Sequence, residues 1–542
     1  MTELLELSKD PGERIQTLKD HGVIYNKNEG KENKDGDTAP EKYAISPYDM
    51  AQFLNKVFSV KYLNESYYFY DKNKGIYIKE NSDVLKSITV ELLTMAMFKK
   101  LFTRTVMLET KHCVESNCLV KDEDLKKAET LIAVNNGLID CYTGEMMPFT
   151  HEVFITNKLD LIYDQQAECP MWLEYLKTTF SDNKEIIDFY QEVWGYTLHK
   201  GMPIKSLFMH IGPPDSGKTQ GLHVFDEMLG TSRNVAYISL DKFDDPTYIN
   251  GLYGKMANVD FEIKDLKEAL ECGNLKKASG GQDKITERSA YAKEPMGFTN
   301  FAKLHFVMNE FPKIKDATGA VYKRIYVIEY PNSFDVDSPT TVKELGEKIL
   351  ENDKSGIFNW MMTGYRRLVD NGFIFNYPEN LNSIKEGRRK EYNSIYAFIT
   401  DMTVKTGNPD DRIYLADLYL KYYGDYMAEN FPHVKEWHRA KSARDFGMKV
   451  KSVFGGSVII PQNRYYLKGY IVKSKNEMPA GVLYDEENDY NMTMKLEKTE
   501  EKVTEKVVVP AIKQAESFKD RYKPEPFIDG SSDGNPFFRS DV

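Results

Sequence analysis

The sequence lacks any run of about 18 apolar residues, which argues against a transmembrane helix. Its first residues, Met1 to Leu7, lack the basic region and the apolar core of a secretory signal peptide. Cysteine is scarce: the five present are an odd number and form no two CxxC pairs, which argues against a disulfide scaffold. His112, Cys113 and Cys118 lie close together, but a zinc site needs four well-placed ligands. We therefore expect a protein of the reducing cytoplasm, bacterial or host, with no membrane partner.

Positive charge is also in deficit. The chain has 72 Lys and Arg residues against 83 Asp and Glu, which leaves a formal net charge of −11. This balance excludes a protein that coats nucleic acid over its whole surface, but it allows contact through a local basic patch. Hydrophobic residues make up 41% of the 542 residues, enough to bury several cores. A chain of this length predicts about two to four folded domains.

Composition and periodicity divide the chain into five segments. Residues 26–42 are polar and lack periodicity, so we interpret them as a disordered linker. Residues 67–79 carry two β-rich runs around a turn, which predicts a hairpin. We predict a flexible segment at 1–44, an α+β, largely helical domain at 45–200, an α/β domain at 201–375, a small helix-and-hairpin domain at 376–476 and an acidic flexible tail at 477–542.

Residues 212–219 follow the pattern GxxxxGK[ST]. The preceding run 206–212 has strand character and residues 220–229 favour a helix, so the loop N–H groups and the helix N-terminus would surround phosphate oxygens. We expect Lys218 to reach the β- and γ-phosphates of ATP, and Thr219 to bind Mg²⁺ through its hydroxyl. The nucleotide-binding residues predicted from this motif are Gly212, Pro213, Pro214, Asp215, Ser216, Gly217, Lys218, Thr219 and Gln220.

Polar residues end the next strands of the same segment. Asp260 and Glu262 end a strand predicted from Lys255, and carboxylates beside a phosphate loop can hold Mg²⁺ and activate water. We favour Glu262 as the base and Asp260 as the acid on the Mg²⁺ side. Asn309 ends a third strand, where its amide can orient the attacking water. Arg324 follows, just before another β-rich run.

This series of motifs resembles the superfamily 3 helicases, in particular the primase–helicase branch found in phages, plasmids and poxviruses. The matching pieces include the segment 212–219, Asp260 and Glu262, residues 280–288, Asn309-Glu-Phe-Pro and Lys323-Arg324. The resemblance extends over about 350 to 400 residues in the same order, a far more specific match than the phosphate loop alone. It implies an α/β fold with an AAA+-like ATPase core, a helical N-terminal region and a C-terminal winged-helix domain.

By resemblance, Arg324 looks like an arginine finger that acts on the triphosphate of a neighbouring subunit in a ring, most simply a hexamer. The predicted catalytic residues are then Lys218, Asp260, Glu262, Asn309 and Arg324. The stretch 285–306 resembles the hairpin of this family that reaches DNA in the central channel. Its tip offers Arg288, Tyr291 and Lys293, which can hold phosphates or stack on a base.

The small C-terminal domain is the local basic patch. Residues 435–475 contain ten basic and two acidic residues, a net charge of +8. This concentration predicts a DNA surface, with a recognition helix at 441–453 and a wing near 455–466. The residues that we expect to contact DNA are Lys441, Arg444, Lys449, Lys451 and Arg464. The tail could also serve as a docking peptide for a replication protein.

The leading hypothesis is an ATP-dependent, ring-forming DNA helicase that initiates or drives replication of a phage, plasmid or related mobile element. We expect its partners to be single-stranded and forked DNA, with a specific replication origin as a further candidate. One alternative is a bifunctional primase–helicase, although the N-terminal region looks short for a primer-synthesis core. The other is an origin-binding protein whose ATP site is a regulatory switch.

Overall fold

The computed structural model describes residues 11–35, 37–95, 98–262, 272–281, 284–287, 296–314, 319–335, 344–434 and 439–474. Among the helices in these ranges, none has both the length and the hydropathy needed to cross a membrane. The five cysteines are all in the free thiol form. Helices and strands alternate along the chain, and the α/β character expected from the sequence is confirmed by a central parallel sheet.

The N-terminal region forms its own small core. Leu18, Val23 and Ile24 are buried in one cluster with Ile45 and Met50. The expectation that residues 1–44 form a flexible segment is therefore wrong for the described residues of α1 and β1, because apolar side chains there are packed. The elements of this region are α1 (Pro11–Asp20), β1 (Ile24–Asn26), β2 (Tyr43–Ile45), α2 (Pro47–Phe58), β3 (Val60–Leu63), β4 (Ser66–Asp71), β5 (Ile76–Glu80), α3 (Ser82–Met95), η2 (Lys99–Leu101), α4 (Arg104–Asn117) and α5 (Asp122–Lys127).

Two predictions for this half of the chain are confirmed. The hairpin expected at 67–79 is formed by β4 and β5, which pair antiparallel with Tyr70 opposite Tyr77. The helices expected before the nucleotide motif are α6 and α7, and Pro170 and the Asn183 side chain mark their first turns. The connecting elements are β6 (Leu131–Val134), β7 (Gly137–Asp140), β8 (Met146–Met147), α6 (Pro170–Thr179) and α7 (Lys184–Tyr196).

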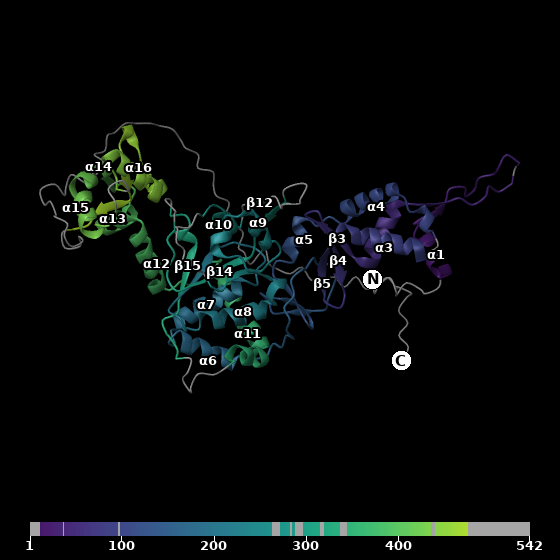
Figure 1. Ribbon diagram of the computed structural model, residues 1–542, viewed down its shortest axis with the longest axis horizontal. Helices are drawn as coiled ribbons and strands as arrows, with labels where there is room; N and C mark the ends of the chain where they lie inside the picture. Colours follow the sequence, from purple (N-terminus) through teal and green to yellow (C-terminus); the bar gives the residue numbers. More distant parts are fainter. Residues whose placement is uncertain are drawn as a thin grey trace. The chain divides into compact units, whose positions relative to one another are not determined.

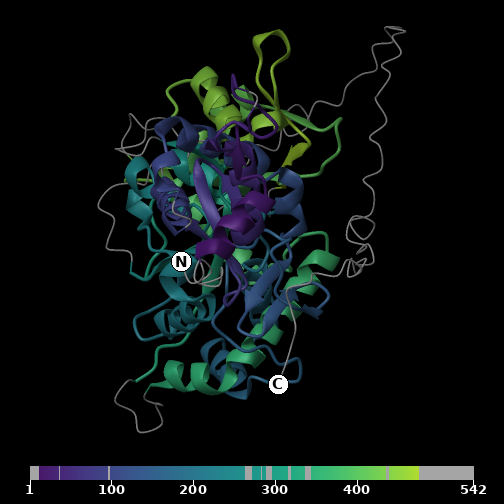
Figure 2. The same ribbon diagram turned by 90° about the vertical axis from the view of Figure 1, so that its right-hand side faces the viewer.

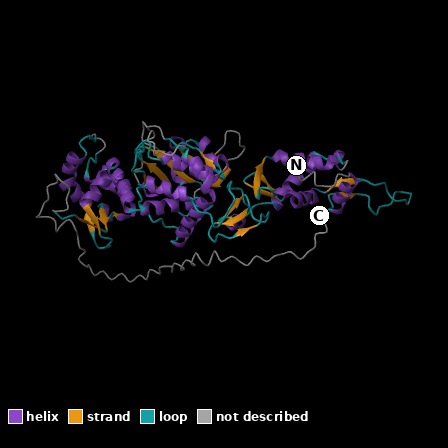
Figure 3. Ribbon diagram, turned by 90° about the horizontal axis from the view of Figure 1, so that it is seen from below, coloured by secondary structure: helices purple, strands orange, loops and turns teal. Residues whose placement is uncertain are grey.

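A five-stranded parallel sheet carries the phosphate-loop motif (Figure 3). Its strand order is β10-β11-β14-β9-β15, so β9 has two later strands as neighbours. Because the strands are parallel, all their C-terminal ends lie at one edge, where α/β proteins bind ligands. The elements are β9 (Leu207–Ile211), α8 (Lys218–Leu229), η3 (Thr231–Arg233), β10 (Val235–Ala236), η4 (Leu240–Lys242), α9 (Pro246–Ile249), η5 (Asn250–Leu252), β11 (Ala257–Asp260), α10 (Gly273–Ala278), β12 (Lys284–Glu287), β13 (Met296–Thr299), β14 (Lys303–Met308), η6 (Tyr322–Arg324), β15 (Ile325–Glu329) and α11 (Leu345–Asp370).

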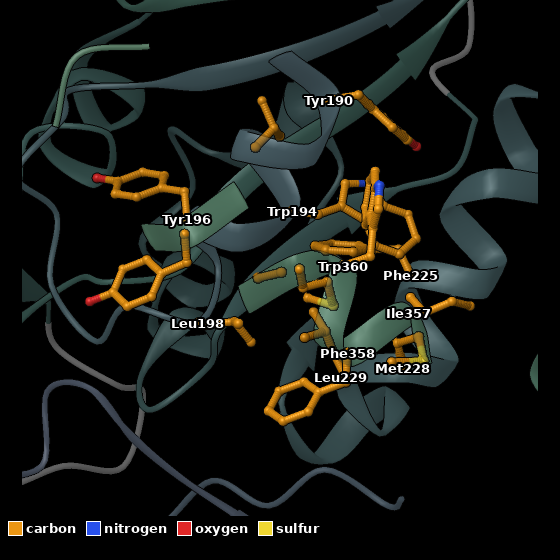
Figure 4. Close-up of a cluster of buried hydrophobic side chains, with 14 of the residues drawn as sticks. Tyr190, Trp194, Tyr196, Leu198, Phe225, Met228, Leu229, Ile357, Phe358 and Trp360 are labelled. Carbon is orange, nitrogen blue, oxygen red and sulfur yellow. The ribbon is translucent and has the colours of Figure 1, made fainter. Parts of the chain in front are cut away.

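Both faces of this sheet are covered. Phe208 of β9 packs into the cluster built with α7, α8 and α11, whereas Leu207 and Met209 pack into the cluster on the opposite face. This alternation follows from the period of two residues in a strand. Figure 1 shows α7, α8 and α11 side by side on one side of the strands. Trp194 and Phe225, whose ring centroids are 4.8 Å apart, lie at the centre of that packing (Figure 4).

The base of the hairpin expected between the second and third strands is present. β12 and β13 pair antiparallel, with Lys284 opposite Thr299 and Glu287 opposite Met296. The residues proposed for its tip, Arg288, Tyr291 and Lys293, lie outside the described residues.

The small C-terminal unit contains helices and short strands around its own core (Figure 2). Along the chain, its regular elements are one helix, two short strands, three helices and three further short strands, and the strands pair antiparallel. A long helix, α12 (Glu379–Tyr392), precedes it. The elements are α13 (Ser394–Met402), β16 (Thr403–Lys405), β17 (Arg412–Tyr414), α14 (Leu415–Leu418), the π-helical turn η7 (Tyr419–Tyr423), α15 (Gly424–Asn430), α16 (Ala443–Phe454), η9 (Gly455–Ser457), β18 (Val458–Ile459), η10 (Pro461–Asn463), β19 (Tyr466–Lys468) and β20 (Tyr470–Val472).

Candidate functional site

The glycine-rich loop connects the end of β9 to the first turn of α8. Gly217 is the N-cap of α8 and has φ of +86°, a left-handed conformation that favours glycine. A Cβ at Gly212 would lie 2.4 Å from the carbonyl oxygen of Tyr330, so only glycine allows this close approach of two backbone segments. The sequence thus places glycine where the loop bends into the helix and where it passes the neighbouring strand.

The side chain of Lys218 is turned into the loop. It is 5% exposed, and its Nζ donates hydrogen bonds to the carbonyl oxygens of Gly212 and Pro213 at 2.6 Å and to Ser216 Oγ at 3.0 Å. Burial lowers the pKa of Lys218, and the nearby Asp215 carboxylate opposes that shift. The ammonium group therefore lies at the centre of the loop that is expected to surround phosphate oxygens.

The remaining loop residues differ in exposure. Pro213, Pro214, Asp215 and Thr219 are exposed, whereas Ser216 is buried. The Nε2 atom of Gln220 would be 1.8 Å from a Cβ at Gly346, so this side chain points toward the start of α11.

Two tyrosines outside the motif contact the loop, and a third is hydrogen-bonded to one of them. The Tyr175 hydroxyl of α6 donates a hydrogen bond to the Gly217 carbonyl at 2.9 Å. Burial raises the pKa of Tyr175 well above its usual range, so the hydroxyl keeps its proton for this bond. Tyr330, whose carbonyl contacts Gly212, is linked through its hydroxyl to Tyr190 of α7 at 3.2 Å. These contacts could not be predicted from the sequence, because aromatic residues at helical spacing are equally typical of an ordinary core.

Two buried histidines continue this polar cluster into the sheet. His210 Nδ1 lies 3.1 Å from the Tyr330 hydroxyl, and His210 Nε2 lies 3.1 Å from His305 Nδ1. Burial lowers the pKa of His210 to about 3 and that of His305 well below its usual value. Both rings are therefore neutral, and they bridge β9 and β14 directly beneath the loop.

The strand register brings the predicted polar residues to the edge that carries the loop. Met308 of β14 pairs with Ile211 of β9, so Asn309 follows one strand away from the loop. Asp260 pairs with Phe306, which places Glu262, two residues later, level with Met308. Neighbouring strands are about 4.8 Å apart, so the Glu262 backbone is about 10 Å from the end of β9. The side chains of Glu262 and Asn309 are both exposed.

Asp260 differs from Glu262 in its surroundings. Its Oδ2 accepts hydrogen bonds from Ser239 Oγ and from the Leu240 N–H, both at 3.0 Å. Burial raises the pKa of the Asp260 carboxyl, and these two hydrogen bonds oppose the shift. Asp260 therefore links the segment after β10 to the sheet through hydrogen bonds, whereas the Glu262 side chain is exposed to solvent.

The oxygen donors at this edge fit a magnesium–nucleotide complex. Mg²⁺ prefers oxygen ligands and is usually held by one or two carboxylates together with substrate phosphates. Thr219 presents an exposed hydroxyl in the first turn of α8, and Glu262 presents an exposed carboxylate. Within the described residues, no three His, Cys, Asp or Glu side chains are grouped so that they could hold a metal ion by themselves.

Arg324 lies at the opposite edge of the sheet. It precedes Ile325, which pairs with Leu207 at the beginning of β9. At about 3.3 Å per residue, Arg324 is therefore about 20 Å along the strands from Gly212. Its Nη1 donates a hydrogen bond to the Ala320 carbonyl at 2.7 Å. This placement rules out contact between Arg324 and the phosphate loop of the same chain.

The predicted DNA-contacting residues of the C-terminal unit lie on and around α16. The Ser442 hydroxyl caps this helix by accepting from the Asp445 N–H, and Phe446, Val450 and Val453 form its buried face. Its exposed face presents Arg444, Met448 and Lys451, which share one side at a spacing of four and three residues. Lys441 and Arg464 are also exposed, and Lys449 is half-buried.

Two families match parts of this chain. The family described as "D5 N terminal like" matches residues 51–181, and the "Family of unknown function (DUF5906)" matches residues 210–324. The second match includes the phosphate loop, the residues at the strand ends and Arg324.

Two viral proteins are similar over about half of the chain. Sequence identity is 22% over 329 residues with "Putative helicase 121R" of Invertebrate iridescent virus 3. It is 21% over 345 residues with "Putative helicase 184R" of Invertebrate iridescent virus 6. These alignments cover 55% and 56% of this chain but 35% of each relative, so the match spans about a third of the viral proteins.

Solved structures titled "The apo structure of NrS-1 C terminal region (305-718)" and "The A form apo structure of NrS-1 C terminal region-CTR" align with 78% of this chain. The two alignments cover 99% and 100% of the solved chains, respectively. Their TM-scores are 0.43 and 0.41, and their sequence identities are 13% and 11%. At these values the likeness carries no argument about function.

Proposed function

Because this chain is related to the phage and viral superfamily 3 primase–helicases, as expected from its sequence, we propose that it is an ATP-dependent DNA helicase of replication. The match to the D5 N-terminal family and the similarity to viral proteins named as helicases carry that relationship. The replicated element would be a phage, a virus, a plasmid or a related mobile element.

One observation supports the activity most directly: the phosphate loop, Asn309 and Glu262 all lie at the C-terminal edge of one parallel sheet. These are the parts that nucleoside triphosphate hydrolysis requires, namely a phosphate cradle, an amide and a carboxylate for the attacking water. Sequence reasoning found each residue separately, and the strand order supports their use together.

In the proposed mechanism, Lys218 binds the β- and γ-phosphates of ATP after exchanging its loop carbonyl partners for phosphate oxygens. Mg²⁺, held by Thr219 and an acidic residue, would supply charge neutralisation at the phosphates. Glu262 accepts the proton of the attacking water, and Asn309 orients that water toward the γ-phosphate. Asp260, bonded to Ser239 and Leu240, acts chiefly by holding this edge in place, with a Mg²⁺ contact as its second proposed role.

A ring of identical subunits would complete this site. Arg324 is too far from its own loop to stabilise charge there, but in a head-to-tail ring it would face the loop of a neighbour. The distance therefore supports action of Arg324 on the adjacent subunit. A hexamer remains the ring size that we propose.

The C-terminal unit would contact DNA through α16 and the adjoining strands. Its order of helices followed by antiparallel strands, together with the exposed Arg444 and Lys451, supports the winged-helix interpretation. In that interpretation α16 is the recognition helix and the segment at 455–466 is the wing.

Steady-state measurement of ATP turnover by the purified chain tests this function. We expect many turnovers per subunit, stimulation by single-stranded DNA and separation of a labelled forked duplex that requires ATP and Mg²⁺. ATP binding followed by at most one turnover would instead identify a regulatory switch. Appearance of labelled oligonucleotides on a single-stranded template would add primer synthesis to the activity.

Removing the positive charges on α16 should weaken DNA binding without affecting the nucleotide site. For the double variant Arg444→Ala, Lys451→Ala, we expect the slope of log K against log salt to fall by about 2, because each phosphate contact contributes about 0.9 on duplex DNA. Fluorescence anisotropy with a labelled duplex at several salt concentrations measures this slope. Lys405→Ala, an exposed lysine of β16, is the control. An unchanged slope would remove α16 from the DNA surface.

A further inference from the structure

A buried arginine of α12 lies between the turn that carries Arg324 and the C-terminal unit. Arg389 is 7% exposed and belongs to the last turn of α12. The central carbon of its guanidinium is 3.6 Å from the ring centroid of Tyr396 and 5.6 Å from that of Tyr322. Tyr396 belongs to α13 of the C-terminal unit, whereas Tyr322 is in η6 together with Arg324. One planar cation therefore contacts both parts.

The same guanidinium rests against the backbone of the turn before η6. Gly319 has φ of +66°, and a Cβ there would lie 2.1 Å from Arg389 Nη2. The next residue, Ala320, supplies the carbonyl that accepts the hydrogen bond from Arg324 Nη1. The Gly319 carbonyl itself accepts from the Lys323 N–H at 3.2 Å. Arg389 thus packs on the short turn, residues 319–324, that orients the Arg324 side chain.

The end of α12 also forms a hydrogen bond and an ion pair with the C-terminal unit. The Tyr396 hydroxyl donates a hydrogen bond to Glu386, whose carboxylate lies 3.9 Å from Arg389 Nη1. Lys390 forms an ion pair of 2.6 Å with Asp401 of α13. These contacts tie the position of α13 to the orientation of Arg389.

We propose that Arg389 is a positioning residue for Arg324, and that through Tyr396 it transmits the placement of the C-terminal unit to the turn at 319–324. This inference rests on the proposed function, because it assigns a role to Arg389 in the action of Arg324 on a neighbouring subunit. The stacked guanidinium is held by two aromatic rings, so a shift of α13 displaces it against the Gly319 backbone. A displacement of about 1 Å at a catalytic group can change a rate by about 100-fold.

The variant Arg389→Met tests this role, because it keeps an apolar side chain but removes the planar cation. We expect ATP turnover to fall by about 10- to 100-fold, while binding of a fluorescent ATP analogue stays as in the wild type. Mixing Arg389→Met subunits with Lys218→Ala subunits should restore turnover. The Lys218→Ala subunits supply a correctly placed Arg324, and the Arg389→Met subunits supply an intact phosphate loop. Mixing with Arg324→Ala subunits should restore none, because both partners then lack a working Arg324.

Arg388→Met, which removes an exposed arginine paired with Glu391, is the matched control and should turn over ATP normally. Unchanged turnover of Arg389→Met, or rescue by Arg324→Ala in place of Lys218→Ala, would overturn the proposal. If Arg389→Met does not fold, Tyr396→Leu removes the same stacking from the other side and must give the same pattern of rescue. Failure of the proposed function can be told apart from failure of this inference. If the proposed function is wrong, the wild type does not turn over ATP, or mixing Lys218→Ala with Arg324→Ala subunits restores no turnover.

Discussion

Lys218→Ala should abolish both ATP turnover and DNA unwinding. The Lys218 ammonium lies within hydrogen-bond distance of three oxygens of the loop, where the phosphates of ATP would compete for it. Removing one preorganised donor from an oxyanion hole typically costs about 10²- to 10³-fold in rate, and Lys218 in addition carries a full positive charge. We expect turnover to fall by at least this factor, measured as phosphate release with and without single-stranded DNA.

Two further measurements make this result specific. Lys205→Ala removes an exposed lysine just before β9, at the edge of the sheet away from the loop, and should leave turnover unchanged. The melting temperature separates a local loss from unfolding, because Lys218 also satisfies buried carbonyl groups. Full unwinding by a folded Lys218→Ala protein would show that the segment 212–219 does not power the activity.

Arg324→Ala should lose ATP turnover as severely as Lys218→Ala, but for a different physical reason. Arginine residues that stabilise the transferring phosphoryl group contribute about 10³- to 10⁵-fold in rate. Because Arg324 is about 20 Å from its own loop, the variant subunit should still bind ATP normally at that loop. We therefore expect lost turnover with unchanged binding of a fluorescent ATP analogue.

Mixed assemblies test whether this arginine acts on a neighbour. In random rings of Arg324→Ala and Lys218→Ala subunits at equal amounts, about a quarter of the interfaces join an intact loop to an intact arginine. Turnover should then reach a corresponding fraction of the wild-type value, although each variant alone is inactive. The neighbouring Lys323→Ala should behave as the wild type. Absence of recovery in assemblies shown to be mixed would place Arg324 outside the shared site.

Local motifs predicted the secondary structure of the central segment well. The strand, loop and helix at 206–229 are β9, the loop and α8, and strands occur where Asp260, Asn309 and Arg324 were expected. This succeeds because a phosphate loop is a local structure, in which glycine positions and the helix start follow from neighbouring residues. The boundary at residue 45 failed, because burial of Val23 and Ile24 depends on residues distant in the sequence.

The roles within the site depended on contacts that no local pattern contains. The sequence presented Asp260 and Glu262 as two similar acids, and only the partners Ser239 and Leu240 separate a bonded, buried carboxylate from an exposed one. Tyr175 reaches the Gly217 carbonyl from 42 residues away in the chain. Side chains of this kind look like ordinary core aromatics until the helices that carry them are packed.

The chain carries in its residue order the phosphate loop, the strand-end acids and amide, and the basic character of its C-terminal unit. Tertiary structure alone decided which of them meet. The strand order β10-β11-β14-β9-β15 places Glu262 and Asn309 at the same edge of the sheet as the loop, whereas Arg324 lies at the other end of the strands. The physical reason is that parallel strands are joined by long crossovers, so their spatial order is set by packing and not by distance along the sequence.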